Sequence, residues 1–341
     1  MVKILFQRFF HVILLRMSVT VASLTFDELK VKWPEFRESL KVPFPFITPD
    51  WLEAWWTSFH DSDELFLRAV YAEAGIIGIA ALRINQGIAR FVGSANVSDY
   101  LDLIVKQGSE TEFLTTILNE IQKAGIKKLE LESLRPDSTV MRYLVPIAKS
   151  NGNVVEIVST DVSLDIALPA TWDSYLASLT THQRHEIGRK LRRLEEAGGI
   201  RFDIKPPQDT PSELATLIKL LKISRSDKAE FMTVPMEAYF NRLGEAMNRI
   251  RILRFGHLRV GETIVASVLC FDYNETRYLY NSGYDPQYSS LSVGLLSKVY
   301  SIKNAIENKM TRYDFLKGAE TYKYHLGGIE MPISHVRIEL C

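Results

Sequence analysis

The sequence is poor in cysteine, with only Cys270 and Cys341 among 341 residues. Two cysteines, one of them at the C-terminus, cannot build the disulfide framework on which small secreted domains depend. Histidine is also sparse, with seven residues, and the one close pair, His182 and His185, has no third ligand signalled nearby. We therefore expect no metal site and a reduced, cytoplasmic setting.

Net charge is absent as well, because 41 basic residues balance 41 acidic ones. Proteins that bind nucleic acid or anionic membranes through their overall field carry an excess of positive charge. The balance argues against DNA as a partner. With 46% hydrophobic and 24% charged residues, the composition is that of an ordinary globular protein, and the length fits about two domains.

Long apolar runs are missing too. The apolar N-terminal stretch is interrupted at Lys3, Arg8 and His11, whereas a membrane-spanning helix needs about 20 apolar residues. No small-residue cleavage site of a signal peptide follows closely. We expect no transmembrane segment and interpret residues 1–24 as a poorly structured extension, with translation starting at Met17. An amphipathic helix lying on a membrane surface is the alternative.

The sequence does contain one concentrated run of structural signals, in residues 277–323. Residues 277–284 alternate large and small side chains as a half-buried strand does. The serine-rich segment 287–292 follows, and Ser292 stands at the N-cap position of a helix. A strand that leads through small residues into a helix start can hold a phosphate group on the free backbone N–H groups. The same arrangement is also common with a purely structural role.

The helix predicted next covers residues 293–308, and a short strand over 313–316 follows it. Its apolar residues recur at steps of three and four and form one buried stripe. Three charged residues fall outside that stripe and are expected on the surface: Lys298, Lys303 and Glu307.

The run GYDPQYSSLSVGLL, followed by YDFLKGAETYK, resembles the GNAT-fold acyltransferase domain of CelD-type polysaccharide-biosynthesis proteins, which are relatives of the FemAB peptidyltransferases. The resemblance covers roughly residues 155–335. In the GNAT superfamily a Gln/Arg-x-x-Gly-x-Gly/Ala turn holds the pyrophosphate of acyl-coenzyme A. At that spacing this chain has Ser289, Ser292 and Gly294, so only the third position matches.

The resemblance implies acetyl-coenzyme A, or another acyl-coenzyme A, as a co-substrate, with no permanently bound cofactor. The residues that it places at the donor are Tyr284, Ser289, Ser290, Leu291, Ser292, Val293 and Gly294. The missing first two motif positions leave an aminoacyl-tRNA donor of the FemAB kind, or a lost activity, as alternatives.

The catalytic candidates lie after the helix. Acyl transfer to an amine needs positioning, a base for the amine proton and an acid for the leaving thiolate. Asp314 and Glu320 are candidate bases, Tyr322 is the candidate acid, and Lys323 is expected to orient a ligand carboxylate or phosphate. The alternatives are packing against the sheet for Tyr322 and an ion pair for Asp314.

A second candidate surface is a basic helix that begins after Thr180 and stops at Gly198-Gly199. Arg189 and Arg193 lie one turn apart on it and could bind an anionic acceptor or a donor phosphate. A solvated basic face is the alternative.

The order of elements appears twice. The helix 110–123 and the strand after it parallel the helix 293–308 and its following strand. We therefore predict an α/β fold with a mixed sheet, made of tandem GNAT-like domains: a degenerate one over 25–152 and an acyltransferase domain over 153–341. The predicted function is acyl transfer to an amine of a small molecule, amino sugar or cell-envelope or polysaccharide precursor. A degenerate binding module is the alternative from another class.

Overall fold

The computed structural model describes residues 19–40 and 42–341. The prediction that translation starts at Met17 lies outside the described residues, as does most of the predicted N-terminal extension. Within that extension, β1 (Thr20–Ser23) pairs antiparallel with β2 (Glu64–Ala72). The extension was therefore predicted too long, and ordered structure already includes Thr20.

In the described part of the first half, four α-helices surround one end of the sheet. Thr25 caps the first of them through a capping box with Glu28. The shortest strand of this part has two residues and starts at Ile104. Besides β1 and β2, the elements are β3 (Gly75–Asn85), β4 (Ile88–Phe91), β5 (Ile104–Val105), β6 (Lys128–Leu134), α1 (Phe26–Ser39), α2 (Pro49–Phe59), α3 (Glu110–Lys123) and α4 (Val145–Ser150).

The second half contains the longer elements. Its strands are β7 (Val154–Ala167), β8 (Ile200–Lys205), β9 (Leu253–Val260), β10 (Thr263–Tyr273), β11 (Thr276–Tyr284), β12 (Arg312–Lys317) and β13 (Ile329–Glu339). Its helices are α5 (Trp172–Ser178), α6 (Thr181–Glu196), α7 (Thr210–Ser224), α8 (Ser226–Phe231), α9 (Val234–Arg249), α10 (Val293–Glu307) and α11 (Thr321–His325), with a 3-10 helix, η3 (Pro286–Leu291), before α10.

All strands join one mixed sheet in the order β1-β2-β3-β4-β6-β13-β7-β12-β11-β10-β9-β8, with β5 attached to β3. The same unit occurs in each half. In the first, α3 lies between the parallel neighbours β4 and β6; in the second, α10 connects the parallel neighbours β11 and β12. This repetition confirms the predicted tandem arrangement within a mixed α/β fold.

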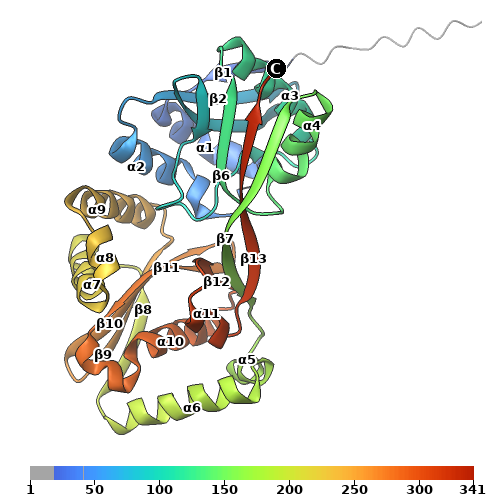
Figure 1. Cartoon of the computed structure of the whole chain (residues 1–341). Coiled ribbons are helices and arrows are strands. Elements are labelled where there is room, and N and C mark those ends of the chain that lie inside the picture. Colours follow the sequence, from blue (N-terminus) through green and yellow to red (C-terminus); the bar gives the residue numbers. More distant parts are fainter. Residues whose placement is uncertain (1–18, 41) are drawn as a thin grey trace, which may run out of the picture.

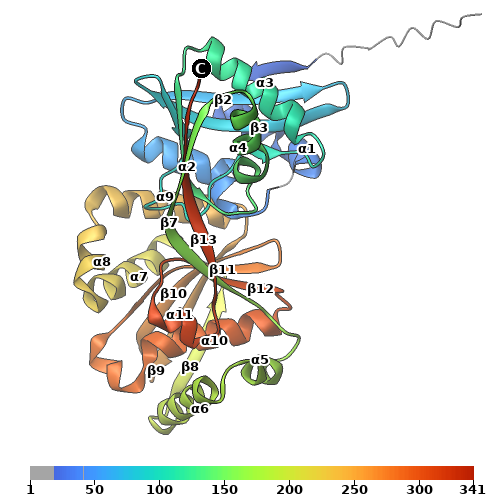
Figure 2. The same cartoon turned by 45° about the vertical axis from the view of Figure 1, so that its right-hand side comes forward.

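Two lobes are visible in Figure 1, and a ribbon of β7 and β13 runs between them. Figure 2 shows the same ribbon crossing the waist of the molecule. The C-terminal strand β13 pairs with β6 of the first half as well as with β7. The domain boundary predicted near residue 153 therefore does not fully separate the two lobes, because the last strand, β13, returns to the first lobe.

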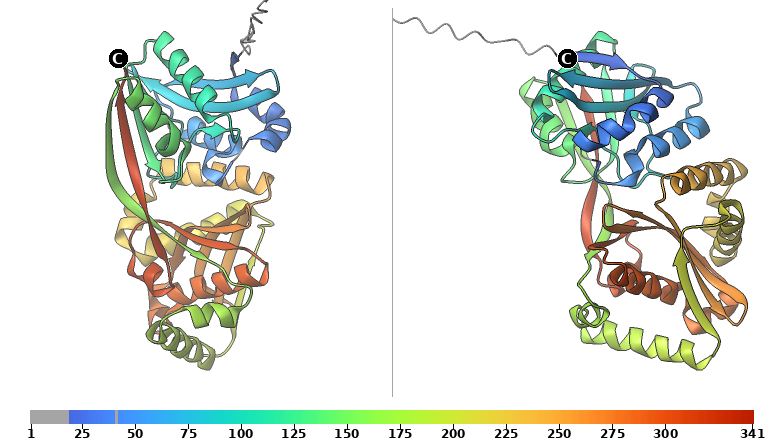
Figure 3. Two further views of the ribbon diagram at one scale, coloured as in Figure 1. Left: turned by 90° about the vertical axis from the view of Figure 1, so that its right-hand side faces the viewer. Right: turned by 180° about the vertical axis from the view of Figure 1, so that it is seen from behind.

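The aromatic residues of α2 belong to the larger hydrophobic core. Trp51 and Trp55 are 0% and 3% exposed, as expected for core packing. The Trp51 indole N–H donates to the Ser98 hydroxyl at 3.1 Å, so its polar edge is satisfied. Helix α2 packs against α9 of the second half, and Figure 3 shows these helices where the lobes meet.

Candidate active site

The candidate active site begins where β11 and β12 separate. Thr276–Tyr278 pairs in parallel with Arg312–Asp314, and the ladder ends there. Beyond this point β11 continues to Tyr284 along β10, while β12 leaves it. The two strands therefore diverge toward the first turn of α10.

The turn into α10 has an unusual cap. Ser292 adopts a left-handed conformation, with φ of 56°, and its side chain does not cap the helix. Its carbonyl oxygen accepts the N–H groups of Leu295 and Leu296, and its hydroxyl instead accepts a 3.2 Å hydrogen bond from Nζ of Lys190 on α6. A basic side chain of α6 thus reaches the N-terminus of α10, the positive end of that helix.

A cavity of about 330 Å³ opens beside this helix start. We call it the lysine pocket, because basic side chains from four different helices or loops line it: Lys190, Arg225, Lys228 and Lys298. Glu320 is the one carboxylate among its lining residues. This excess of positive charge suits an anionic ligand.

Lys298 lies at the inner side of the lysine pocket and is only 7% exposed. Its Nζ atom donates to the carbonyl oxygen of Gly294 at 2.7 Å and lies 4.9 Å from the centre of the Tyr322 ring. The prediction that Lys298 faces solvent is therefore wrong. The buried face of α10 is wider than the apolar pattern indicated, and Lys298 lies on that face.

Burial, and after it the nearby Lys228 ammonium, lowers the pKa of Lys298 to about 7. The pKa of Lys228 is lowered to about 8, first by burial and then by Arg225. Its Nζ donates to the Ser282 carbonyl oxygen at 2.6 Å. The pocket therefore holds two amines that change charge near neutral pH and are stabilised as cations by any anion that enters.

The structure brings most predicted donor residues to this pocket. Its lining includes Tyr284, Ser289, Ser292, Val293 and Gly294. Ser290 and Leu291 are not among the lining residues: Ser290 is exposed, and Leu291 packs against the core around α10. The prediction of direct donor contacts is therefore not supported for these two.

Glycine is required at position 294 by close packing. A Cβ atom built there would lie 2.8 Å from Cδ1 of Tyr284, a distance that forces one of the two groups to move. The small residue thus lets the Tyr284 ring lie against the first turn of α10, and the ring forms one side of the pocket.

Two of the four catalytic candidates, Glu320 and Tyr322, line the lysine pocket. Burial raises the pKa of the Tyr322 hydroxyl, and the Glu320 carboxylate raises it further. The phenol is therefore protonated at neutral pH and can donate a proton or a hydrogen bond.

Lys323 has a different role from the predicted one. Its side chain is 1% exposed, and Nζ donates to the carbonyl oxygens of Leu316 (3.0 Å), Lys317 and Gly318 (2.9 Å). It also pairs with Glu320 at 2.8 Å. Lys323 therefore holds the turn after β12, and the prediction that it orients a ligand is wrong for this arrangement.

Asp314 supports the same turn from the other end. Its Oδ1 accepts the N–H of Leu316 at 2.8 Å, and Leu316 has φ of 64°, a strained conformation for a leucine. The Asp-Phe-Leu-x-Gly-x-Glu-x-Tyr-Lys segment thus mainly stabilises this turn. Asp314 and Lys323 hold its backbone through hydrogen bonds, and Gly318 adopts the φ of 100° that the turn requires.

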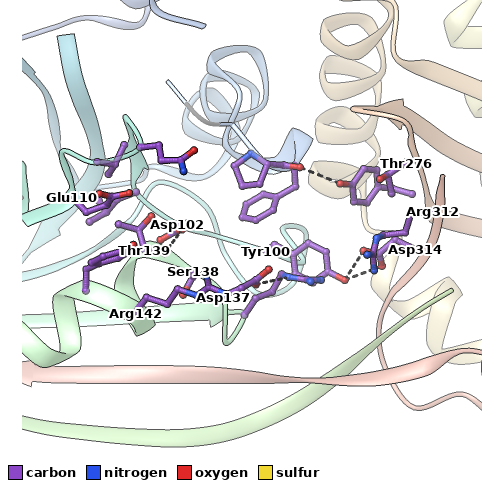
Figure 4. Close-up of a pocket in the computed structure, with 18 residues that line it drawn as sticks. Tyr100, Asp102, Glu110, Asp137, Ser138, Thr139, Arg142, Thr276, Arg312 and Asp314 are labelled. Atoms are coloured by element: carbon purple, nitrogen blue, oxygen red, sulfur yellow. Dashed lines mark hydrogen bonds and ion pairs between the residues drawn. The ribbon is translucent and has the colours of Figure 1, made fainter. Parts of the chain in front are cut away.

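Asp314 also lines a second cavity, of about 320 Å³, which we call the interlobe cavity (Figure 4). Figure 4 shows Tyr100 of the first half pointing at Asp314 of the second, with the hydroxyl 2.8 Å from Oδ1. Burial raises the pKa of Asp314 to about 7. Arg135 lies over the Tyr100 ring at 5.0 Å. The sequence placed Asp314 with Glu320 and Tyr322, but the structure puts it in a separate cavity.

The two arginines predicted to bind an anion are on the outer side of α6. Arg189 is exposed and pairs with Glu186 at 3.0 Å, and Arg193 is exposed. Neither lines the lysine pocket, which Lys190 of the same helix reaches instead. Both arginines therefore lie outside the lysine pocket, and their binding of an anionic acceptor or a donor phosphate stays a prediction.

Several pocket residues were missed in the sequence. Lys298 follows Gly294 by four residues, one helical turn, and this spacing could have placed it beside the helix start. Lys228 and Arg225 carry no such signal, because only the fold brings α8 next to the end of β11. Among residues 19–40 and 42–341, no group of three His, Cys, Asp or Glu residues is placed to hold a metal ion. None of the helices in this part of the chain is long and apolar enough to cross a membrane.

The part of the chain that carries this pocket matches the model of a known protein domain. Residues 181–324 match the model of the acetyltransferase (GNAT) domain. That segment contains α6, α10 and every lining residue of the lysine pocket. No curated protein matches the chain.

Among solved structures, FemX superposes with a TM-score of 0.64 at 12% identity, over 93% of this chain and 96% of that one. A tandem GNAT protein from the clavulanic acid biosynthesis pathway gives 0.50 at 10% identity, over 94% and 98%. The C-terminal domain of a putative lysylphosphatidylglycerol synthetase from Agrobacterium fabrum gives 0.53 at 9% identity, over 84% and 91%. The chain thus has a tandem GNAT-like fold, and its second half carries the sequence pattern of a GNAT acetyltransferase domain.

Proposed function

We propose that this protein is an N-acyltransferase that takes an acetyl or other acyl group from acyl-coenzyme A. The observation that carries the proposal is the lysine pocket, which four basic side chains line beside the N-terminus of α10 and the diverging strands β11 and β12. Helix N-termini with added cations bind phosphate groups well. The GNAT domain match over the same residues supports an acyl donor.

In this proposal, the pyrophosphate of the donor binds the first N–H groups of α10, at Val293 and Gly294. Lys190, Lys228 and Lys298 supply positive charge that compensates for the first two motif residues, which this chain lacks. This substitution explains how a chain with serine at two of three motif positions would still bind the donor.

The acceptor is an amine of a small molecule, an amino sugar or a cell-envelope or polysaccharide precursor. Its nitrogen attacks the thioester carbonyl carbon, a C–N bond forms and the C–S bond breaks. Tyr322, protonated at neutral pH, gives its proton to the leaving thiolate. Glu320, which lines the same pocket, takes the amine proton. Asp314, the second candidate base, has a pKa of about 7 but lines the interlobe cavity.

Isothermal titration with acetyl-coenzyme A tests the donor. We expect binding by the wild-type chain and a loss of roughly tenfold or more for Lys298→Met, equivalent to about 1.4 kcal/mol. Lys303→Met is the matched control, because Lys303 is on the same helix and is not among the pocket residues. No binding by the wild type at millimolar acetyl-coenzyme A would exclude this donor.

An aminoacyl-tRNA donor of the FemAB kind is the second candidate. It is favoured by the fold shared with FemX and by the exposed arginines of α6, among them Arg189 and Arg193. Binding of aminoacyl-tRNA that weakens steeply with salt, and weakens in an Arg189→Ala/Arg193→Ala double variant, would support it. Acetyl-coenzyme A binding unaffected by the same double variant would support the first candidate.

A degenerate GNAT-like module remains the non-enzymatic alternative. It predicts donor binding without transfer to any amine. Mass-spectrometric detection of acylated product across a panel of amino sugars and amino acids separates the two, because a single acylated acceptor that depends on Tyr322 establishes an enzyme.

A further inference from the structure

Near the waist of the molecule, the outer edge of β7 over residues 154–159 pairs with no other strand among residues 19–40 and 42–341. Residues 154–159 pair regularly with residues 334–339 of β13 on one side. On its other side, β7 pairs with β12 only from Ser163 onward. Figure 3, left, shows β7 along the outer margin of the molecule. Its backbone groups there are open to another strand.

This edge is also apolar. Val154, Ile157 and Val158 are 66%, 41% and 41% exposed, and they fall within five consecutive residues of one strand. Proteins usually protect such an edge with lysine, proline or a bulge. Within residues 154–159 the ladder has no bulge, and the sequence VVEIVS has neither lysine nor proline.

We propose that β7 pairs antiparallel with β7 of a second copy of this chain across a two-fold axis. The charge of the edge favours this occupant. Glu156 is the only ionisable residue from Val154 to Thr160, so two copies oppose like charges in one register alone. Arg337 on β13 lies 3.1 Å from Glu156 and offsets its charge.

The neighbouring strand limits the geometry. Since the pairing with β13 shifts register at Thr160 and β12 occupies the β7 edge from Ser163 onward, the regular edge open to a partner strand covers residues 154–159. An antiparallel two-fold near Ile157 satisfies this limit on both copies at once. Such an arrangement is isologous and closed, so it forms a dimer and not a filament.

Multi-angle light scattering on the full chain, across roughly 1 to 100 µM, tests the proposal. We expect a mass approaching twice the 38.9 kDa of one chain as concentration rises. Ile157→Lys should restore the single-chain mass. Val234→Lys is the matched control, because Val234 is an exposed β-branched residue, 82% exposed, far along the chain from β7, and this variant should stay dimeric.

Hydrogen exchange of the unmodified chain gives a second readout that needs no substitution. The amides of residues 154–160 should gain protection with rising concentration, while those of the control strand β8 should not. A monomer at 100 µM, or a dimer that Ile157→Lys leaves intact and that gives these amides no protection, would overturn the proposal. Either result is independent of donor binding.

Discussion

Nζ of Lys298 donates a 2.7 Å hydrogen bond to the carbonyl oxygen of Gly294, one turn earlier in the same helix. The contact bends the lysine back toward the start of α10, where the donor phosphates are proposed to bind. A buried amine with few neutralising partners is costly in the free protein. The charged form of the same amine becomes favourable when an anion enters the pocket. The charge of Lys298 therefore links both the stability of the protein and its ligand binding to pH.

Lys298→Met should stabilise the free protein while weakening donor binding. The folded-state pKa of about 7 lies below the ordinary value of 10.5, so between these pH values the unfolded chain binds more protons. Wild-type stability should therefore rise from pH 7 to 10, and the variant should lack this part of the slope. At pH 7 we expect a gain of about 1–4 kcal/mol. Urea unfolding at several pH values measures both effects; an unchanged slope would show that Lys298 is not the group responsible.

Donor binding should weaken as pH rises above about 7, because Lys298 and Lys228 lose the charge that attracts the phosphates. Below that pH both amines are cations and the affinity should level off. Titrations in buffers of different ionisation enthalpy should show proton uptake on binding near pH 8. Binding with no proton uptake would mean that the anion does not contact these amines.

Gly294→Ala should reduce donor affinity although it adds only a methyl group. The added Cβ would lie 2.8 Å from the Tyr284 ring, and moving the ring would reshape one side of the pocket. Gly294→Glu should be worse, by roughly 2–3 kcal/mol or more, because it also places a negative charge at the positive end of α10. Gly188→Ala, where the nearest atom is the flexible Arg192 tip at 3.5 Å, is the control.

The sequence predicted the strand, turn and helix of the second half because their patterns are local. The spacing of apolar residues places α10, and small residues mark its start. The positions of Lys228 and Arg225 could not be predicted, since only the packing of α7 and α8 on β11 brings them to the pocket. Asp314 illustrates the opposite error: neighbours in sequence, such as Asp314 and Tyr322, can serve different cavities when a turn separates them.

Lys323→Met should destabilise the protein rather than alter ligand affinity directly. Three backbone carbonyl groups would lose their shared donor in a buried site, a loss of about 3 kcal/mol or more. Lys309→Met, on an exposed residue, should change stability little. If Lys323→Met were as stable as the wild type and lost donor affinity, the original expectation of a ligand contact would be restored.

Tyr322→Phe should leave acetyl-coenzyme A affinity almost unchanged and lower turnover by roughly 10²–10⁴-fold. The ring that lies beside Lys298 is kept, and only the hydroxyl that protonates the thiolate is lost, an effect confined to the transition state. Tyr324→Phe is the control, because that hydroxyl bonds to Glu330 and is not among the pocket residues. Full turnover by Tyr322→Phe would remove Tyr322 from the mechanism.

Asp314→Asn separates the two roles of Asp314, in the turn and as a base. The folded-state pKa of about 7 lies above the ordinary 3.8, so between these values the folded chain binds more protons. Wild-type stability should therefore fall as pH rises from about 4 to 7, and the variant should lack this fall. The asparagine oxygen can still accept the Leu316 N–H, so the turn should persist.

If Asp314 takes the amine proton, wild-type turnover should rise through pH 7 and the variant should be slow at every pH. A variant with full turnover and an unchanged pH profile would leave Asp314 as a residue of the turn alone and assign the proton to Glu320.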